Sequence, residues 1–350
     1  MQVVFLPFTA QQNPYQQKLS QALAPFGVDI HAPGQAPLQS LLNRRIQGKL
    51  DLVHIHWVSP LLLGAGKGAS ILKSSLFILT CLALRAGGVK LVWSVHNLLG
   101  HESCQPGLEI FARKILYRIC NHVIVHCPGA GRAIRETYQL PQQALEKITI
   151  IPHGHYINDY ANKISPLAAR RRLGLPTAGR SWLYFGLIRP YKNVSALIET
   201  FKQIEGDNLS LIIAGEPQDE QLKSEIQRQI ASHRRIQARL EFIPDDEIQT
   251  YMNAADLAVL PFRTILTSSS IMLAMSYAKA VVTPAIGCSP HILSQQRQLL
   301  YDPQSKTGLR DRLLASREMD LDRIGRHNLE IVRRFPWELT GQKTYELYRR

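Results

Sequence analysis

The chain has 350 residues, of which 45% are hydrophobic and 19% charged, and its formal net charge is +14. This length suggests about two domains, and the composition supports packed cores and argues against disorder. The positive charge indicates an anionic partner, such as a phosphorylated ligand or a membrane surface. Because the basic residues are dispersed and no zinc-finger or RNA-binding motif is present, we expect no nucleic-acid partner. The N-terminus lacks the charged region of a signal peptide, which favours a cytoplasmic protein.

Apolar runs alternate with helix-like patterns along the chain. Predicted strands lie at 3–6, 28–31, 51–56, 89–95, 122–126 and 148–151, with helices between them at 14–25, 38–50, 110–120 and 130–138. After a connection at 159–178 the pattern restarts, with strands at 182–185, 209–214, 240–243, 257–260 and 280–283 and helices from 195 and at 219–238, 246–255 and 270–278. This alternation predicts an α/β protein with two doubly wound parallel sheets that face a cleft.

An apolar segment at 70–87 carries an uncharged run of eleven residues between Lys73 and Arg85. A membrane-spanning helix needs about 20 apolar residues, so we do not expect this segment to span. It predicts a buried or half-buried helix of the first domain. The alternative is partial insertion into a lipid surface, which the basic composition favours.

A strand, a tight turn and a helix are predicted at residues 183–204. The apolar run ends at Gly186, which allows the backbone to turn sharply, and Arg189 and Lys192 follow three residues apart. Cations beside a helix N-terminus suit a diphosphate, because free N–H groups and the helix dipole already favour an anion there. The alternative is an ordinary turn with two solvated basic residues.

Six short motifs together resemble the GT-B glycosyltransferases, especially glycosyltransferase family 4. They lie at 53–57, 95–97 and 151–154 in the first half and at 185–192, 211–216 and 242–248 in the second, in the order that the family keeps. The resemblance implies two Rossmann-like domains facing a cleft. The acceptor-binding domain would cover 1–160, the sugar-nucleotide domain 161–335, and a last helix at 336–350 would pack back on the first domain.

The resemblance also implies the reaction. A sugar would pass from a UDP- or GDP-sugar to a lipid-linked or polysaccharide acceptor, without a metal or cofactor, in exopolysaccharide or glycolipid synthesis. The protein would be cytoplasmic, with peripheral contact to the inner face of the membrane. The histidine pairs His54/His56, His96/His101 and His153/His155 have the spacing of strand ends rather than of a metal-ligand set.

Candidate site residues follow from the motifs and from their places at strand ends. Donor-binding candidates are Gly186, Arg189, Lys192, Glu216, Ile243, Thr267, Ser268, Ser269, Ser270, His153 and Gly154. Acceptor-binding candidates are Asn13, Tyr15, His56, Trp57 and His101. His96 is a catalytic candidate that would approach the donor, and Glu102 is the candidate base of an inverting mechanism. A structural histidine and a solvated loop carboxylate are the alternatives for these two.

The chain departs from family 4 at one informative point. Where the family carries two glutamates eight residues apart, this sequence has Ile265 and Leu273, and a hydroxyl-rich segment, 267–270, precedes the next helix. Such hydroxyls cap a helix and can cradle phosphate. The departure leaves retention and inversion both open, and it keeps two other hypotheses: a catalytically silent scaffold relative, and an epimerase or phosphorylase on the same architecture.

Overall fold

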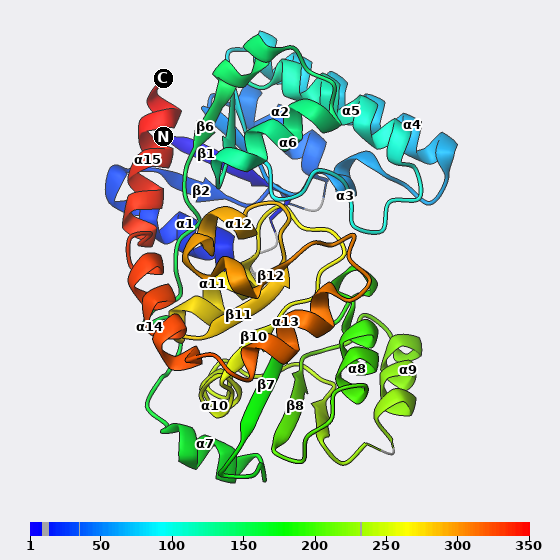
Figure 1. The fold of residues 1–350 in the computed structure, drawn as a ribbon. Helices are drawn as coiled ribbons and strands as arrows, with labels where there is room; N and C mark the ends of the chain where they lie inside the picture. Colours follow the sequence, from blue (N-terminus) through cyan, green and yellow to red (C-terminus); the bar gives the residue numbers. More distant parts are fainter. Residues whose placement is uncertain (9–13, 35, 232) are drawn as a thin grey trace. The chain divides into compact units, whose positions relative to one another are not determined.

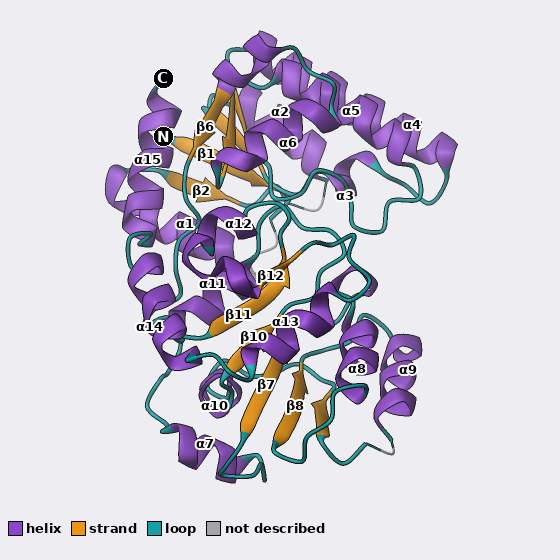
Figure 2. Ribbon diagram, in the orientation of Figure 1, coloured by secondary structure: helices purple, strands orange, loops and turns teal. Residues whose placement is uncertain are grey.

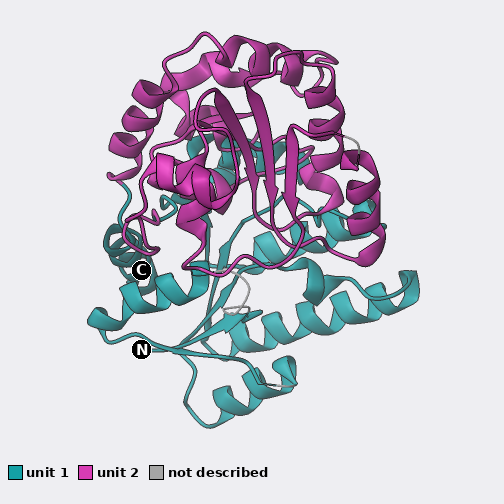
Figure 3. Ribbon diagram, turned by 90° about the horizontal axis from the view of Figure 1, so that it is seen from below, with its two compact units in different colours: residues 1–154, 335–350 teal, residues 155–334 magenta. Residues whose placement is uncertain are grey.

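The computed structural model describes residues 1–8, 14–34, 36–231 and 233–350. The chain forms two compact units (Figure 3): Met1–Gly154 together with Phe335–Arg350, and His155–Arg334. Each unit is built around a six-stranded parallel sheet with helices packed against it (Figures 1 and 2). The predicted α/β class with two doubly wound sheets is therefore confirmed.

In the first unit the strand order is β2-β1-β3-β4-β5-β6. The strands are β1 (Gln2–Leu6), β2 (Asp29–His31), β3 (Leu52–Ile55), β4 (Lys90–Ser94), β5 (His122–Val125) and β6 (Ile148–Ile150). The helices are α1 (Pro14–Leu23), α2 (Pro37–Ile46), α3 (Ser59–Leu62), α4 (Lys67–Ala86), α5 (Pro106–Ile119), α6 (Pro128–Thr137) and α15 (Trp337–Arg349), with 3₁₀ turns η1 (Ala24–Phe26) and η2 (Gln142–Lys147). The last helix, α15, packs against α1 within this unit.

In the second unit the strand order is β12-β11-β10-β7-β8-β9. The strands are β7 (Arg180–Phe185), β8 (Leu209–Ala214), β9 (Ile236–Arg239), β10 (Leu257–Val259), β11 (Ala280–Pro284) and β12 (Leu300–Tyr301). The helices are α7 (Pro166–Arg172), α8 (Val194–Lys202), α9 (Glu220–Ile230), α10 (Ile248–Ala254), α11 (Ser269–Ser276), α12 (Ser289–Ile292), α13 (Gly308–Ser316) and α14 (Leu321–Val332), with 3₁₀ turns η3 (Pro190–Lys192) and η4 (Ser294–Leu299).

The strand orders identify the place in each sheet where a ligand is expected. In the first sheet the winding changes direction between β1 and β3, and in the second sheet between β7 and β10. Open α/β sheets bind ligands outside the carboxyl ends of the strands at such a switch point. The residues that follow β3, β7 and β10 are therefore expected to line the ligand-binding sites.

Two predictions about the elements were wrong in detail. The helix expected at 219–238 ends at Ile230, and the strand expected at 240–243 lies at Ile236–Arg239, where it pairs with β8. Phe242, which was included in the predicted strand, lies in the loop after β9 and is largely exposed. The residues around Arg234 are good helix formers, so propensity alone extended the helix, whereas pairing with β8 fixes the strand.

The helix predicted over the apolar segment at 70–87 is confirmed, and it is partly buried in the first unit. The segment belongs to a twenty-residue helix, α4, that by length and composition is long enough to cross a membrane. Lys73 and Arg85 lie within α4, on either side of the uncharged run of eleven residues. Only about a quarter of its best apolar window, 28%, is buried within the protein.

Candidate active site

The turn after β7 brings the predicted cations of the second unit to the switch point. Gly186 adopts a φ of 122°, which disfavours any side chain, and its N–H donates to the Ala214 carbonyl of the neighbouring strand. Arg189 and Lys192 flank the 3₁₀ turn η3, which leads directly into α8. No side chain caps the first turn of α8 among the described residues. Its N–H groups therefore keep the anion-binding capacity expected of a helix N-terminus.

Lys192 and Ser270 converge over Gly186 from different elements. A Cβ added at Gly186 would lie 3.3 Å from the Ser270 Oγ and 3.6 Å from the Lys192 Nζ. Lys192 comes from the turn after β7 and Ser270 from the first turn of α11. The structure thus brings together three donor-binding candidates, of which Ser270 lies far along the chain from Gly186 and Lys192. An ammonium, a hydroxyl and an open backbone form a polar cradle around one point.

The two cations of this turn differ in their surroundings. Burial, followed by the nearby charge of Arg189, lowers the pKa of Lys192 from 10.5 to about 8. Arg189 instead donates from Nη1 to the Gln218 Oε1, at 3.0 Å. No carboxylate forms an ion pair with Lys192 in the described part of the chain. An anionic ligand would therefore relieve an unfavourable charge at Lys192.

The loop between β10 and α11 supplies hydroxyl groups to the same end of the sheet. Ser268 caps α11 by accepting from the Ile271 N–H, so the expected N-cap is present. Thr267 Oγ1 is buried and makes no hydrogen bond within the described residues. A buried hydroxyl without a partner is costly, which marks it as a group that a ligand can satisfy. Ser269 and Ser270 follow in the first turn of α11.

Close approach of two turns also shapes this edge of the sheet. Gly215, after β8, has a φ of 149°, and a Cβ there would lie only 2.0 Å from the Gly186 carbonyl oxygen. The two turns can approach each other only because both carry glycine. The sequence analysis included Gly215 in a motif but gave it no role. Glu216 is exposed, and Ile243 is buried in the loop after β9.

In the first unit, rings rather than charges gather at the carboxyl end of the sheet. Tyr15 on α1 lies at the centre: its ring centroid is 4.7 Å from His96, 5.1 Å from His153 and 5.3 Å from Trp337. The ring cluster, as it is called from here on, consists of Tyr15, His54, His56, Trp57, His96, His126, His153 and Trp337. His54 lies within β3, and His56, His96, His126 and His153 follow β3, β4, β5 and β6.

Sequence reasoning found only part of the ring cluster. His54, His126 and Trp337 were not assigned to the site, although His54 lies within one predicted strand and His126 ends another. Within the cluster, Tyr15, His56 and His153 are almost fully buried, whereas Trp57 is half-buried and His96 keeps 8% of its surface exposed. His96 and Trp57, whose rings stack with centroids 4.6 Å apart, are therefore the members positioned to touch a ligand. Asn13 lies outside the described residues.

Burial keeps the imidazoles of the ring cluster neutral. Desolvation, with neighbouring imidazoles as the second cause, lowers the pKa of His54 and of His153 to about 3. Burial lowers the pKa of His126 to about 4, against a hydrogen bond to Ile151 that raises it. Burial also lowers the pKa values of His56 and His96 well below 6.5. A neutral imidazole orients a substrate through one donor and one acceptor, and carries no charge.

His56 bears directly on the orientation of His96. His56 Nδ1 and His96 Nε2 are 3.2 Å apart, and His56 Nε2 is buried without a hydrogen-bond partner among the described residues. A buried N–H without a partner is rarer than a buried acceptor without one. The favoured arrangement has the His56 Nδ1–H donating to His96, which leaves the proton of His96 on Nδ1. His96 then offers an N–H donor.

Gly154 has a packing role that the sequence analysis did not anticipate. A Cβ at Gly154 would lie 2.3 Å from Cδ2 of Trp337, so the glycine leaves room for the indole at the start of α15. The same segment is tied by Thr340, whose hydroxyl donates to the Pro152 carbonyl at 3.0 Å. His153 Nδ1 lies 2.7 Å from the Gly154 carbonyl. Trp337 therefore occupies the side of Gly154 on which a side chain would lie.

A buried ion pair holds the loop that follows His96. Glu109 and Arg113 on α5 are fully buried and 2.7 Å apart. Glu109 accepts from the Gly100 N–H, and Arg113 donates to the Asn97 carbonyl. The loop therefore has a fixed base, while Glu102 near its tip is exposed and His101 half-buried. Sequence reasoning missed this pair, although an i, i+4 Glu–Arg spacing on a helix is a readable signal.

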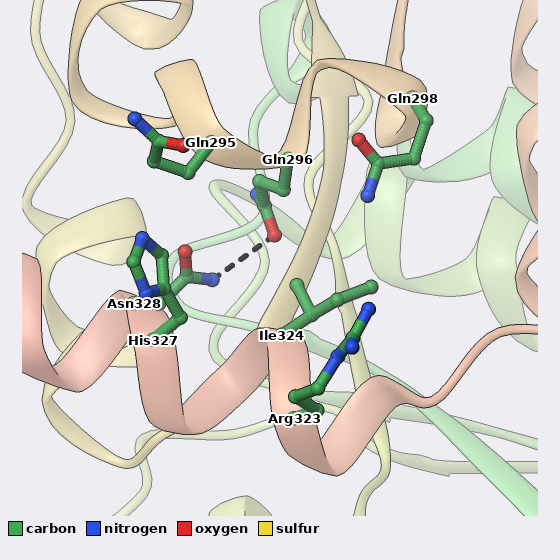
Figure 4. Close-up of a pocket in the computed structure, with 7 residues that line it drawn as sticks. All are labelled: Gln295, Gln296, Gln298, Arg323, Ile324, His327 and Asn328. Atoms are coloured by element: carbon green, nitrogen blue, oxygen red, sulfur yellow. Dashed lines mark hydrogen bonds between the residues drawn. The ribbon is translucent and has the colours of Figure 1, made fainter.

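A separate hollow of the second unit lies between η4 and α14 (Figure 4). It is lined by Gln295, Gln296, Gln298, Arg323, Ile324, His327 and Asn328. Asn328 donates to the Gln296 Oε1, and the same amide group bonds the backbone of Val281 near the start of β11. These polar groups hold α14 and η4 to the amino half of β11. The hollow is therefore remote from the carboxyl-end loops of its own sheet.

The described residues include no group of three or more His, Cys, Asp or Glu side chains placed to hold a metal ion.

Comparison with solved structures defines the class of fold. The chain is similar to sucrose-phosphate synthase from Thermosynechococcus elongatus, with a TM-score of 0.74 and 18% identity over 100% of this chain and 98% of that one. It is also similar to Anabaena HepE in complex with UDP and glucose, with a TM-score of 0.73 and 17% identity over 99% of each chain. These likenesses and the two sheets define a GT-B fold.

Sequence comparison then assigns the family. Residues 20–157 match the model for Glycosyltransferase Family 4, and residues 179–316 match the model for Glycosyl transferases group 1. The chain belongs to this family of GT-B enzymes and is a nucleotide-sugar glycosyltransferase, as the resemblance predicted.

Two curated relatives have names that state an activity. One is the GDP-mannose:glycolipid 4-beta-D-mannosyltransferase of Xanthomonas campestris pv. campestris, 28% identical over 79% of this chain and 70% of that protein. The other is the D-inositol 3-phosphate glycosyltransferase of Corynebacterium glutamicum, 25% identical over 58% of this chain. Only about half of that second protein, 51%, is covered by the match.

Proposed function

We propose that this glycosyltransferase moves a hexose from a GDP- or UDP-sugar to a lipid-linked saccharide, in glycolipid or exopolysaccharide synthesis. The convergence of Lys192 and Ser270 over Gly186 is the observation that carries the donor half of the proposal. The acceptor half is supported by the Xanthomonas relative, whose name specifies GDP-mannose and a glycolipid. We place the protein in the cytoplasm, in peripheral contact with the inner face of the membrane.

On this proposal, the second unit stabilises the leaving group. Lys192 and Arg189 neutralise the charge that grows on the nucleoside diphosphate as its bond to the sugar breaks. The hydroxyls of Thr267 and Ser270, with the first N–H groups of α11, donate to the phosphate oxygens. Ser268 and Ser269 hold that helix start, while Ile243 borders the nucleotide base. Glu216 faces solvent, so its assignment to the donor is the weakest supported by geometry.

The first unit would orient the acceptor hydroxyl and the donor sugar. His96 donates a hydrogen bond from Nδ1, and half-buried Trp57 offers an apolar face to a sugar ring. Tyr15, His56 and His153 are almost fully buried, so they position His96 and Trp57 rather than touching substrate. Glu102, on the loop braced by Glu109, is the proposed general base, and His101 beside it the proposed acceptor contact.

We further propose that the reaction inverts the anomeric configuration. Ile265 and Leu273 carry no carboxylate where family 4 places two glutamates, so an acidic partner for the sugar is missing at these positions. The Xanthomonas relative is named for a β-linked product. A solvent-accessible carboxylate such as Glu102 can deprotonate the acceptor hydroxyl as it attacks.

The proposal is tested by product analysis. Purified protein is incubated with radiolabelled GDP-mannose, GDP-glucose or UDP-glucose and with lipid extracted from the source membranes. A labelled product that partitions into organic solvent is expected with one donor, and NMR of its anomeric proton is expected to show inversion. Product that forms only in the aqueous phase would contradict the lipid-linked acceptor. Release of free sugar without transfer would instead favour an epimerase-type hydrolysis of the donor.

A further inference from the structure

Helix α4 of the first unit exposes a row of large aliphatic residues, while its buried face mixes apolar and hydroxyl side chains. Its buried residues are Ser70, Ser74, Phe77, Thr80, Cys81 and Leu84. Its exposed large aliphatic residues, called the leucine face from here on, are Ile71, Leu72, Leu76, Leu79 and Leu82. A surface helix of a water-soluble protein buries its apolar stripe and exposes its polar residues. Half of the buried positions of α4 carry hydroxyls, and the largest aliphatic residues of the helix are exposed instead.

Two of the buried hydroxyl groups of α4 make hydrogen bonds to backbone carbonyls. Ser74 donates to the Leu62 carbonyl at 2.7 Å, and Thr80 donates to the Leu76 carbonyl one turn earlier at 2.8 Å. Both polar groups are thus satisfied within the protein. The leucine face, in contrast, is open: Leu72 is 62% exposed, Leu79 61% and Leu76 50%. A contiguous apolar stripe of this kind marks an interaction surface.

The charges near the leucine face have one sign. The sequence of α4 contains Lys67, Lys73 and Arg85 and no acidic residue. Helix α5 packs against α4 and exposes Phe111 and Arg118. These two residues are two helical turns apart and therefore lie on the same face of α5. Long basic side chains at the ends of an apolar stripe reach the headgroup level of a lipid surface. A second copy of the chain would bring the same positive charges together, which disfavours self-association through α4.

The contacts of α4 rule out a simple spanning arrangement. Twenty residues are enough to cross a bilayer, but α4 packs along its length against α2, α3, α5 and β4 of its own unit (Figures 1 and 3 show this helix). A helix that is part of a folded α/β unit on one side exposes only its other side. An interfacial helix lies in the membrane plane in this way.

We infer that α4 binds the surface of an anionic membrane with its axis parallel to the bilayer, and inserts the leucine face below the headgroups. The basic residues Lys67, Lys73 and Arg118 contact anionic headgroups. The proposed partner is the membrane that would hold the lipid-linked acceptor, so this inference rests on the proposed function. It assigns the membrane contact to one helix and one face of that helix.

A vesicle-binding assay tests the inference. The full chain is mixed with extruded vesicles of phosphatidylglycerol and phosphatidylethanolamine, and binding is measured by co-flotation. The variant Leu76→Ser/Leu79→Ser is expected to lower the partition coefficient at least about tenfold, because two inserted aliphatic side chains are lost. The matched control is Leu167→Ser, an exposed leucine of the second unit. Wild-type binding by the double variant would overturn the inference.

Depth measurement separates insertion from electrostatic attraction. The variant Leu76→Trp is expected to be quenched by lipids brominated on their acyl chains, whereas Leu167→Trp is not. Loss of binding in high salt together with no quenching of Leu76→Trp would show attachment by charge alone, and would contradict insertion. Self-association that Leu76→Ser/Leu79→Ser abolishes, without vesicle binding by the wild type, would assign α4 to a second copy and overturn the inference.

Turnover distinguishes failure of this inference from failure of the proposed function. The double variant is expected to keep wild-type turnover with a detergent-solubilised acceptor and to lose it with the same acceptor embedded in vesicles. Equal turnover with embedded acceptor would overturn the role of α4 while leaving the proposed function standing. Normal vesicle binding with no glycolipid product from any donor would overturn the proposed function and leave the membrane surface standing.

Discussion

The carboxyl ends of the two sheets carry opposite kinds of chemistry on the same type of scaffold. In the second unit an ammonium and hydroxyls surround a bare glycine, and Lys192 has no carboxylate partner among the described ion pairs. In the first unit eight rings pack together, and burial keeps their imidazoles neutral. The sheet topology determines where a ligand is expected, at the carboxyl ends of the strands. The side chains at that place determine whether an anion or a neutral hydroxyl compound is expected there.

Removing the cation should produce the largest effect. We expect Lys192→Ala to lower kcat/KM by about 100-fold or more, because a group that stabilises the leaving diphosphate is lost. Initial rates with a saturating acceptor measure this. The matched control is Lys202→Ala at the other end of α8, whose ammonium pairs with Glu199 near the surface. Equal losses in both variants would show a general electrostatic effect and remove the distinction between the two sheet ends.

Substitutions in the ring cluster of the first unit should lower the turnover rate. We expect His96→Ala to lower kcat by roughly 100-fold while nucleoside diphosphate affinity stays within a few fold, since this residue acts on the sugar rather than on the phosphates. His56→Phe should lower kcat less, because it removes only the group that orients His96. Rate measurements beside calorimetry check the split. A His96→Ala variant that loses nucleotide affinity instead would contradict the comparison.

The pH dependence of nucleotide binding sharpens the assignment of Lys192. Its pKa, lowered to about 8 by burial and by Arg189, means that the ammonium loses its proton between pH 7 and pH 9. Affinity for GDP or UDP should therefore fall about tenfold over this range, as the protonated fraction falls from about 90% to about 10%. Lys192→Arg should bind with a flat profile, because guanidinium stays charged. A flat profile in the wild type would place the anion elsewhere.

The neutral histidines predict a loss of stability in acid. Their pKa values are lowered in the folded protein, to about 3 for His54 and about 4 for His126, so the unfolded chain binds protons first as the pH falls below 6.5. Their contribution is complete above pH 6.5 and falls by about 1.4 kcal/mol per pH unit for each histidine below it. Urea unfolding between pH 7 and pH 5 measures this. Replacing His54 with Gln should reduce the slope, and an unchanged slope would contradict neutral burial.

The smallest effect tests packing at the edge of the ring cluster. Gly154→Ala places a methyl group against the Trp337 indole, so we expect a destabilisation of about 1–3 kcal/mol with little change in nucleotide affinity. Thermal unfolding beside calorimetry checks both parts. Gly107→Ala, where an added methyl group meets nothing within 4 Å and φ is not positive, reports the effect of a glycine-to-alanine change alone. Weakened nucleotide binding in Gly154→Ala would instead support the phosphate role predicted for Gly154.

The sequence carried most of the fold and part of the site. Alternating apolar runs and helical patterns predicted both sheets, and the glycine after a strand with Arg189 and Lys192 beyond it predicted the cationic turn. Long-range convergence was not readable: nothing local shows that Ser270 meets Lys192, or that Trp337 fills the space beside Gly154. The apolar segment of α4 left burial and lipid insertion both open, because the sequence alone does not show which residues of the helix face inward.

Calorimetric titration of GDP and UDP into the wild type, Lys192→Ala and Lys202→Ala tests most directly whether the second unit binds the diphosphate. We predict binding of one nucleotide by the wild type and by Lys202→Ala, and a loss of at least about tenfold in affinity in Lys192→Ala. Undiminished affinity in Lys192→Ala, or no affinity of the wild type for either nucleotide, would contradict this account of the cationic turn.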